Sequence, residues 1–220
     1  MLQGLGMDDA DPYAHGGSSD DEEFDAGAEF EWQQEEPIME DLPPELHCFE
    51  TGEPFKVSLI HQTPLTGDVP YSVRKVYRGS EVIMECAMTL DEMSELEEGL
   101  SESSKARIEE HVGEQLDLAD RFEKLMENPD GPEFGRWTSR CAFTGQPREE
   151  CKEYSITALC QGGKLLYLPN SPVMLSDTFA EIMQSLLSEE TRRYLDDFVG
   201  EHFPTPPNLE DLPVRPMLIG

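Results

Sequence analysis

Basic residues are scarce in this sequence. There are 16 Lys and Arg against 47 Asp and Glu, and the formal net charge is −31 at pH 7. Proteins bind nucleic acids and anionic membranes through basic surfaces that displace counterions. The composition therefore argues against direct binding to either. An acidic surface favours a basic protein partner, mimicry of a polyanion, or a solubilising role with no specific partner.

Long apolar runs are absent as well. None approaches the roughly 18–20 residues that a membrane-spanning helix needs, and the first residues lack the basic and apolar regions of a secretory signal. The chain has five cysteines without paired C-x-x-C spacing. An odd number of unpaired cysteines indicates reduced thiols, so we expect a cytoplasmic protein with no membrane association.

Recognisable catalytic motifs are also missing. The sequence contains no nucleophile elbow, P-loop, dinucleotide-binding glycine pattern or H-E-x-x-H zinc motif. The His and Glu residues near Gly113 and Gly200 fit solvated helix faces. The sequence therefore predicts a protein that is not an enzyme and holds no cofactor.

The first part of the chain is an acidic arm. Residues 1–45 contain no Lys or Arg and few apolar residues, so they cannot bury enough surface to offset the entropy of ordering, and we expect disorder. Phe24, Phe30 and Trp32 are flanked by acids and are the candidate partner-binding residues. Such aromatics can dock into an apolar groove with a basic rim. Alternatively, they contact only the folded body, or nothing.

An internal repeat is the clearest signal in the sequence. Residues 48–54 (CFETGEP) recur as residues 141–147 (CAFTGQP), and both fit C-x-x-T-G-[EQ]-P. Two further blocks match in the same order, the second with identical internal spacing: 76–79 with 159–162, and 100–114 with 187–201. Because chance matches would not keep this order, the pattern predicts a tandem duplication.

The predicted fold class is α+β, with two tandem diverged repeats that each form a small antiparallel sheet followed by a helix pair. The four segments are an arm at 1–45, repeat units at 46–130 and 131–203, and a Pro-rich extended tail at 204–220. We expect an apolar interface between the units, because neither is large enough for a full core. The candidate interface residues are Phe122, Leu125, Trp137, Tyr194 and Phe198.

Local patterns place the individual elements. Ser101 and Ser188 are expected to cap helices, the first of which continues along one apolar stripe to Met126. Earlier helices are expected around residues 90–96 and 179–186. The expected strands lie at 46–49, 55–61, 71–77 and 82–86 in the first unit, and at 137–143, 154–160 and 165–168 in the second.

Each repeat begins with a Thr-Gly turn. The turn residues are Cys48, Thr51 and Gly52, then Cys141, Thr144 and Gly145. We expect positive φ at both glycines. The C-x-x-T-G turn is similar to half of a zinc knuckle in which Thr replaces the second Cys. Because neither repeat supplies a paired C-x-x-C, we expect buried cysteines without metal.

The function that these observations favour is a non-enzymatic acidic interaction or adaptor protein with a basic protein partner. One alternative is a nucleic-acid mimic that blocks a DNA- or RNA-binding protein. Its candidate carboxylates are Asp91, Glu92, Glu95, Glu97, Glu98, Glu102, Glu109 and Glu110. Another is a small zinc-binding protein derived from a zinc-knuckle fold.

Overall fold

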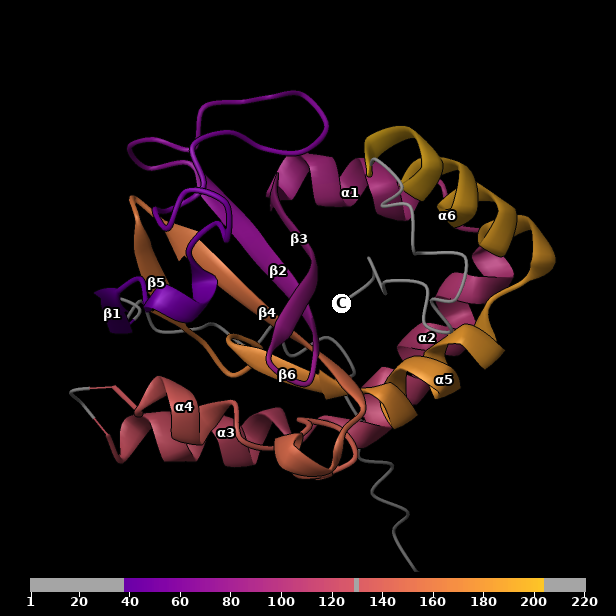
Figure 1. The fold of residues 1–220 in the computed structure, drawn as a ribbon. Coiled ribbons are helices and arrows are strands. Elements are labelled where there is room, and N and C mark those ends of the chain that lie inside the picture. The colour runs from indigo at the N-terminus through magenta and orange to yellow at the C-terminus, as the bar shows by residue number, and fades with distance from the viewer. Residues whose placement is uncertain (1–37, 129–130, 204–220) are drawn as a thin grey trace, which may run out of the picture. The chain divides into compact units, whose positions relative to one another are not determined.

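The structure, a computed structural model, describes residues 38–128 and 131–203. Its centre is one antiparallel sheet (Figure 1). The sheet contains β1 (Ile38–Asp41), β2 (Pro70–Arg78), β3 (Glu81–Thr89), β4 (Glu153–Gln161), β5 (Lys164–Tyr167) and β6 (Val173–Ser176). The strand order is β1-β5-β4-β2-β3, and β6 also pairs with β4. The predicted α+β class is confirmed, but the strands form one sheet rather than two.

β2 and β4 form the middle of the sheet. They pair antiparallel along their full lengths, with Arg74 opposite Thr157 at the midpoint. On its other side β2 pairs with β3, and the corresponding side of β4 is shared by β5 and β6. Residues from both sequence repeats therefore lie side by side in one sheet, because neither β2 nor β4 finds all its backbone partners in its own half.

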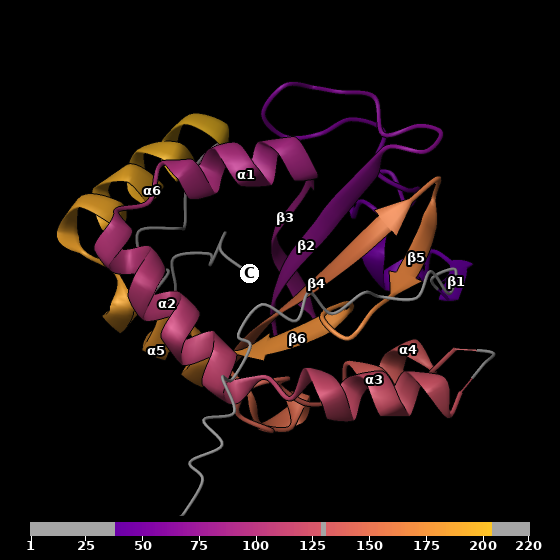
Figure 2. The same cartoon turned by 180° about the vertical axis from the view of Figure 1, so that it is seen from behind.

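Six helices accompany this sheet in the described residues. They are α1 (Leu90–Glu98), α2 (Glu102–Gln115), α3 (Leu118–Met126), α4 (Phe134–Trp137), α5 (Asp177–Leu186) and α6 (Glu189–His202). Figures 1 and 2 show α1 continuing from the end of β3, and α5 from the end of β6. Each of these helices begins at a hydroxyl cap, Thr89 or Ser176, whose side chain accepts a backbone N–H of the first turn. Within the described ranges, every helix is too short or too polar to cross a membrane.

Two apolar clusters pack on opposite faces of the sheet. Val73, Ala87 and Ala158 belong to the larger cluster, which also contains Phe179 and Met183 of α5. Cys86 and Met88 alternate with Ala87 along β3 and point to the other face, where they join Leu96 of α1 and Leu195 and Phe198 of α6. Both faces of β2 are therefore buried, whereas β4 is buried on one face and half-buried on the other.

Several predicted elements differ from those observed. Residues 44–46 form a short 3-10 helix, and α4 occupies the start of the strand expected at 137–143. The strand expected at 55–61 contributes only an isolated bridge between Val57 and Pro64. Leu46, Phe55 and Cys141 of these segments pack into the larger cluster, but the backbone forms no more than isolated bridges, such as that of Cys141 with Met174 of β6. A propensity pattern does not separate core packing from membership of a strand.

The long helix expected to continue to Met126 is interrupted. α2 ends at Gln115, Leu116 adopts an extended backbone, and Asp117 caps α3 by accepting the N–H of Asp120. The apolar stripe loses its continuity as a result, and Phe122 and Met126 are 39% and 51% exposed. A capping Asp thus outweighs the apolar periodicity at this position.

The candidate interface residues do not form one contact surface. Leu125 belongs to the larger cluster and Phe198 to the smaller one. Trp137 and Tyr194 are half-buried, and Phe122 is exposed. The segments 46–130 and 131–203 are joined mainly by the pairing of β2 with β4 and by the core on either side of it.

Candidate functional site

The aromatic residues of the arm, Phe24, Phe30 and Trp32, lie outside the described residues. Most of the arm and the tail at 204–220 also lie outside them. Docking through these aromatics stays a prediction.

The two Thr-Gly turns share their hydrogen bonds position by position. Cys48 N–H donates to Glu53 O at 2.9 Å, and Cys141 N–H donates to Gln146 O at 2.9 Å. In both turns the glycine N–H donates to the cysteine carbonyl, and the threonine Oγ1 accepts the N–H two residues later at 3.3 Å. Gly52 and Gly145 have φ of 69° and 68°, the positive values that the sequence predicts.

The surroundings of the two turns differ. The first lies against β3, where Glu85 accepts the N–H of Phe49 at 2.8 Å. The second lies against β6, where Ala142 N–H donates to Met174 O. Since β3 and β6 are separated by β2 and β4, the fold does not bring Cys48 and Cys141 into one site.

The cysteines themselves also differ. Cys48 is half-buried, short of the expected burial, whereas Cys141 is 3% exposed. Burial raises the pKa of the Cys141 thiol, but hydrogen bonds from Ser176 and Thr144 outweigh that effect and the pKa is lowered. All five cysteines are free. The part of the chain that the structure describes holds no group of three His, Cys, Asp or Glu suited to a metal ion.

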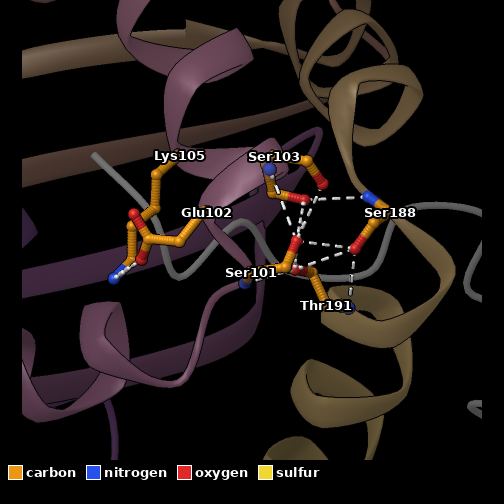
Figure 3. Close-up of polar contacts among 7 residues, drawn as sticks. Ser101, Glu102, Ser103, Lys105, Ser188 and Thr191 are labelled. Atoms are coloured by element: carbon orange, nitrogen blue, oxygen red, sulfur yellow. Dashed lines mark hydrogen bonds and ion pairs between the residues drawn. The ribbon is translucent and has the colours of Figure 1, made fainter.

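A hydroxyl cluster joins the starts of α2 and α6 (Figure 3). The two capping serines, Ser101 and Ser188, are 2.8 Å apart between their Oγ atoms. The bonds around them are reciprocal: Ser101 N–H donates to Thr191 Oγ1 at 3.0 Å, and Ser188 N–H donates to Ser104 Oγ at 2.8 Å. Ser104 and Thr191 are fully buried. Sequence patterns identified each cap, but not their contact, which depends on the tertiary fold.

A hollow of about 750 Å³ lies beside α3, α4 and the second turn. Arg121 stacks over the Trp137 ring at 4.4 Å and donates to Pro172 O at 2.7 Å. Burial lowers the pKa of Arg121 to about 10. Four cations and four carboxylates line the hollow: Arg121, Lys124, Arg136, Arg140, Asp117, Asp120, Glu127 and Glu133. This balance gives the hollow no net preference for either sign of charge.

The surface of α1 and α2 is rich in carboxylates. We define the acidic helix surface as its seven exposed carboxylates: Asp91, Glu95, Glu97, Glu98, Glu102, Glu109 and Glu110. Only two of them have a basic side chain within 4.0 Å among the described residues, Glu95 with His61 and Glu102 with Lys105. The remaining carboxylates face solvent.

Glu92 is the remaining member of the eight candidate carboxylates, and its side chain points inward. Its carboxylate accepts Ser58 Oγ and His61 N–H, both at 2.6 Å, and closes the capping box of α1 by accepting the N–H of Thr89 at 3.0 Å. The residue is fully buried. Glu92 therefore has a structural role and cannot contact a partner.

Comparisons with known proteins give no relatives: no family model, curated protein or solved structure matches this chain.

Proposed function

We propose that this chain is a non-enzymatic interaction or adaptor protein that binds a basic protein partner. The observation that carries the proposal is the acidic helix surface, where five of seven exposed carboxylates have no basic neighbour among the described residues. The negative field of these carboxylates steers a cationic partner toward the surface. Once the partner is bound, its positive charges reduce the repulsion between the carboxylates. The net charge of −31 supports the same reading.

The test compares two variants with equal changes in charge. One neutralises the helix surface (D91N/E97Q/E98Q/E109Q/E110Q), and the other neutralises five acids of the arm (D20N/D21N/E22Q/E23Q/D25N). Both are used to capture partners from the source organism, and each captured partner is then titrated against the full chain. We expect the helix variant to lose the partner and the arm variant to keep it. Equal capture by the two variants would refute a role for the helix surface.

A polyanion mimic is the second candidate, because the exposed acids follow one another along two consecutive helices. A mimic differs from an adaptor in its effect on the partner. A mimic competes with DNA or RNA for the partner, whereas an adaptor binds without displacing nucleic acid. Displacement of labelled duplex from the captured partner separates these two functions.

We also propose that residues 46–130 and 131–203 derive from one duplicated unit. The matching turn hydrogen bonds support this, as do the helices of 14 residues that begin after Ser101 and Ser188. The β2–β3 and β4–β5 hairpins also pair equivalent positions at their ends: Tyr77 pairs with Val82, and Cys160 pairs with Leu165.

Exchanging the turn sequences tests this proposal. The variant F49A/E50F/E53Q gives the first turn the residues of the second. If the turns are equivalent, its midpoint of urea unfolding stays close to that of the wild type. An unfolded variant, when E50Q/E53Q folds normally, would count against equivalence.

A further inference from the structure

Arg74 is a buried cation at the centre of the sheet. Its side chain is on the middle residue of β2, and the residue is 3% exposed. Nε donates to Thr157 Oγ1 at 2.9 Å, but Nη1 is buried without a hydrogen-bond partner. No described carboxylate forms an ion pair with it. A buried guanidinium without a counter-ion is unfavourable, so an anionic partner at this position would be stabilising.

The other buried charges show what Arg74 lacks. Lys75, the next residue of β2, is 3.1 Å from Glu85 and donates to His47 O at 2.6 Å. Glu153 is 2.7 Å from Arg78. Glu92 accepts several hydrogen bonds, as described above. Within the described residues, Arg74 is the buried charge that has neither an opposite charge nor a complete set of hydrogen bonds.

The side chain of Arg74 points to the sheet face that carries the smaller apolar cluster. Its cross-strand partner on β3 is Cys86, which belongs to that cluster, and its partner on β4 is Thr157. Ser155, Thr157 and Leu159 alternate onto this same face of β4 and are only half-buried. The neighbours of Arg74 on this face are thus apolar or hydroxyl side chains, and none of those named carries a charge.

The last described residue lies on the same face. Phe203 packs against the cluster that contains Cys86, Met88 and Leu96. The chain continues from there for another 17 residues, PTPPNLEDLPVRPMLIG. This segment has two acids, Glu210 and Asp211, and both are set among apolar residues. Seven and eight residues separate Phe203 from these two acids, and an extended segment of that length spans up to about 25 Å.

We propose that residues 204–220 dock on this face of the sheet and that Glu210 or Asp211 is the counter-ion of Arg74. The composition of the segment matches the face: Leu209 and Leu212 flank the acids, as Val76 and Leu159 flank Arg74 on the strands. Its prolines restrict the free chain, which reduces the entropy lost on docking.

A double-mutant cycle in the full chain tests the pairing. The variants are E210Q/D211N, R74M and their combination, and each is unfolded in urea. We expect E210Q/D211N to lower the equilibrium constant for folding at least tenfold, and to have little effect once Arg74 is replaced. The arm variant E22Q/E23Q, which also removes two charges, is the matched control. Equal effects of E210Q/D211N with and without Arg74 would overturn the pairing.

Thiol labelling gives a second measurement that does not require the R74M protein to fold. Cys86 lies opposite Arg74, whereas Cys160 is buried on the other face of the sheet. With a small alkylating reagent and mass spectrometry, we expect E210Q/D211N to speed labelling of Cys86 at least tenfold relative to Cys160. Unchanged labelling of Cys86 would contradict docking.

Inorganic phosphate serves as a probe for an external anion. If the segment provides the counter-ion, phosphate should stabilise the wild type no more than a sulfate salt of the same ionic strength does. Stabilisation by phosphate that requires Arg74 and is unaffected by E210Q/D211N would instead assign this face to an external ligand and overturn the proposal.

Discussion

Two glycines fix the backbone of the Thr-Gly turns. An added Cβ at Gly52 or Gly145 would meet no atom within 4 Å, so sterics with neighbouring residues do not require glycine there. The requirement comes from φ of 69° and 68°, a conformation that residues with a Cβ adopt at a cost. The same backbone conformation thus favours glycine at both turns, although the cysteines of the two turns differ in burial.

Replacing either turn glycine with alanine should therefore lower the free energy of unfolding by about 1 kcal/mol. Gly113→Ala and Gly200→Ala are the matched controls, because these glycines lie inside α2 and α6 with open space around them. In a helix the same change should stabilise by roughly 0.5–1 kcal/mol. Urea unfolding measures all four, and a turn variant as stable as the wild type would show that the turn relaxes.

Buried thiols make the stability of this protein sensitive to alkaline pH. Burial raises the pKa of Cys86 to about 11 and that of Cys160 to about 12. The unfolded chain loses these protons near pH 9, before the folded protein does. The stabilisation is thus fully present below pH 9 and is lost as the pH rises through the folded values.

We expect the free energy of unfolding to fall between pH 9 and 12, and C86A/C160A to reduce that slope. Each unit of pKa shift corresponds to about 1.4 kcal/mol. Denaturant unfolding across this range measures the slope, with each protein's value at pH 7 as its reference. A variant whose slope equals that of the wild type would assign the alkaline loss to other groups.

At the scale of elements, the α2–α6 junction couples two helix starts. Ser101→Ala or Ser188→Ala should each lower the free energy of unfolding by about 1 kcal/mol. The double variant should lose less than the sum, because each serine Oγ contacts the other and the first substitution already removes that bond. Ser94→Ala, which changes an exposed hydroxyl of α1, is the control and should stay within about 0.5 kcal/mol. Strict additivity would mean that the two caps act independently.

The contact between α1 and α6 depends on the absence of a side chain at Gly99. A Cβ there would overlap Cζ of Tyr194, so the tyrosine ring would have to move. Gly99→Ala should lower the free energy of unfolding by about 1–3 kcal/mol. The loss should be smaller in a Tyr194→Leu background, since the shorter side chain leaves room. An equal loss in both backgrounds would place the strain elsewhere.

At the scale of the whole molecule, self-repulsion opposes folding. With a net charge of −31, the compact state brings many carboxylates together. Raising ionic strength from roughly 0.01 M to 0.15 M shortens the screening length from about 30 Å to about 8 Å. The melting temperature should therefore rise with NaCl over this range, and rise less in the helix variant D91N/E97Q/E98Q/E109Q/E110Q. A melting temperature that falls with salt would indicate that attractive ion pairs dominate.

Features that depend only on neighbouring residues could be predicted before the fold was known. The C-x-x-T-G turns have the predicted glycine conformation because φ is a local property. The serine caps at Ser101 and Ser188 were likewise predictable, since a cap involves only the next three residues. The exposed acids of α1 and α2 follow from helical periodicity, with Glu92 as the exception because its partners lie far away in the chain.

The pairing of distant segments could not be predicted in this way. Strand propensity does not specify a partner, so one sheet across both halves could not be distinguished from two small sheets. The same applies to the contact between the caps, which are 87 residues apart, and to the burial of Arg74. These features arise when β2 meets β4, because burial and hydrogen-bond satisfaction are properties of the assembled core rather than of the segments that enter it.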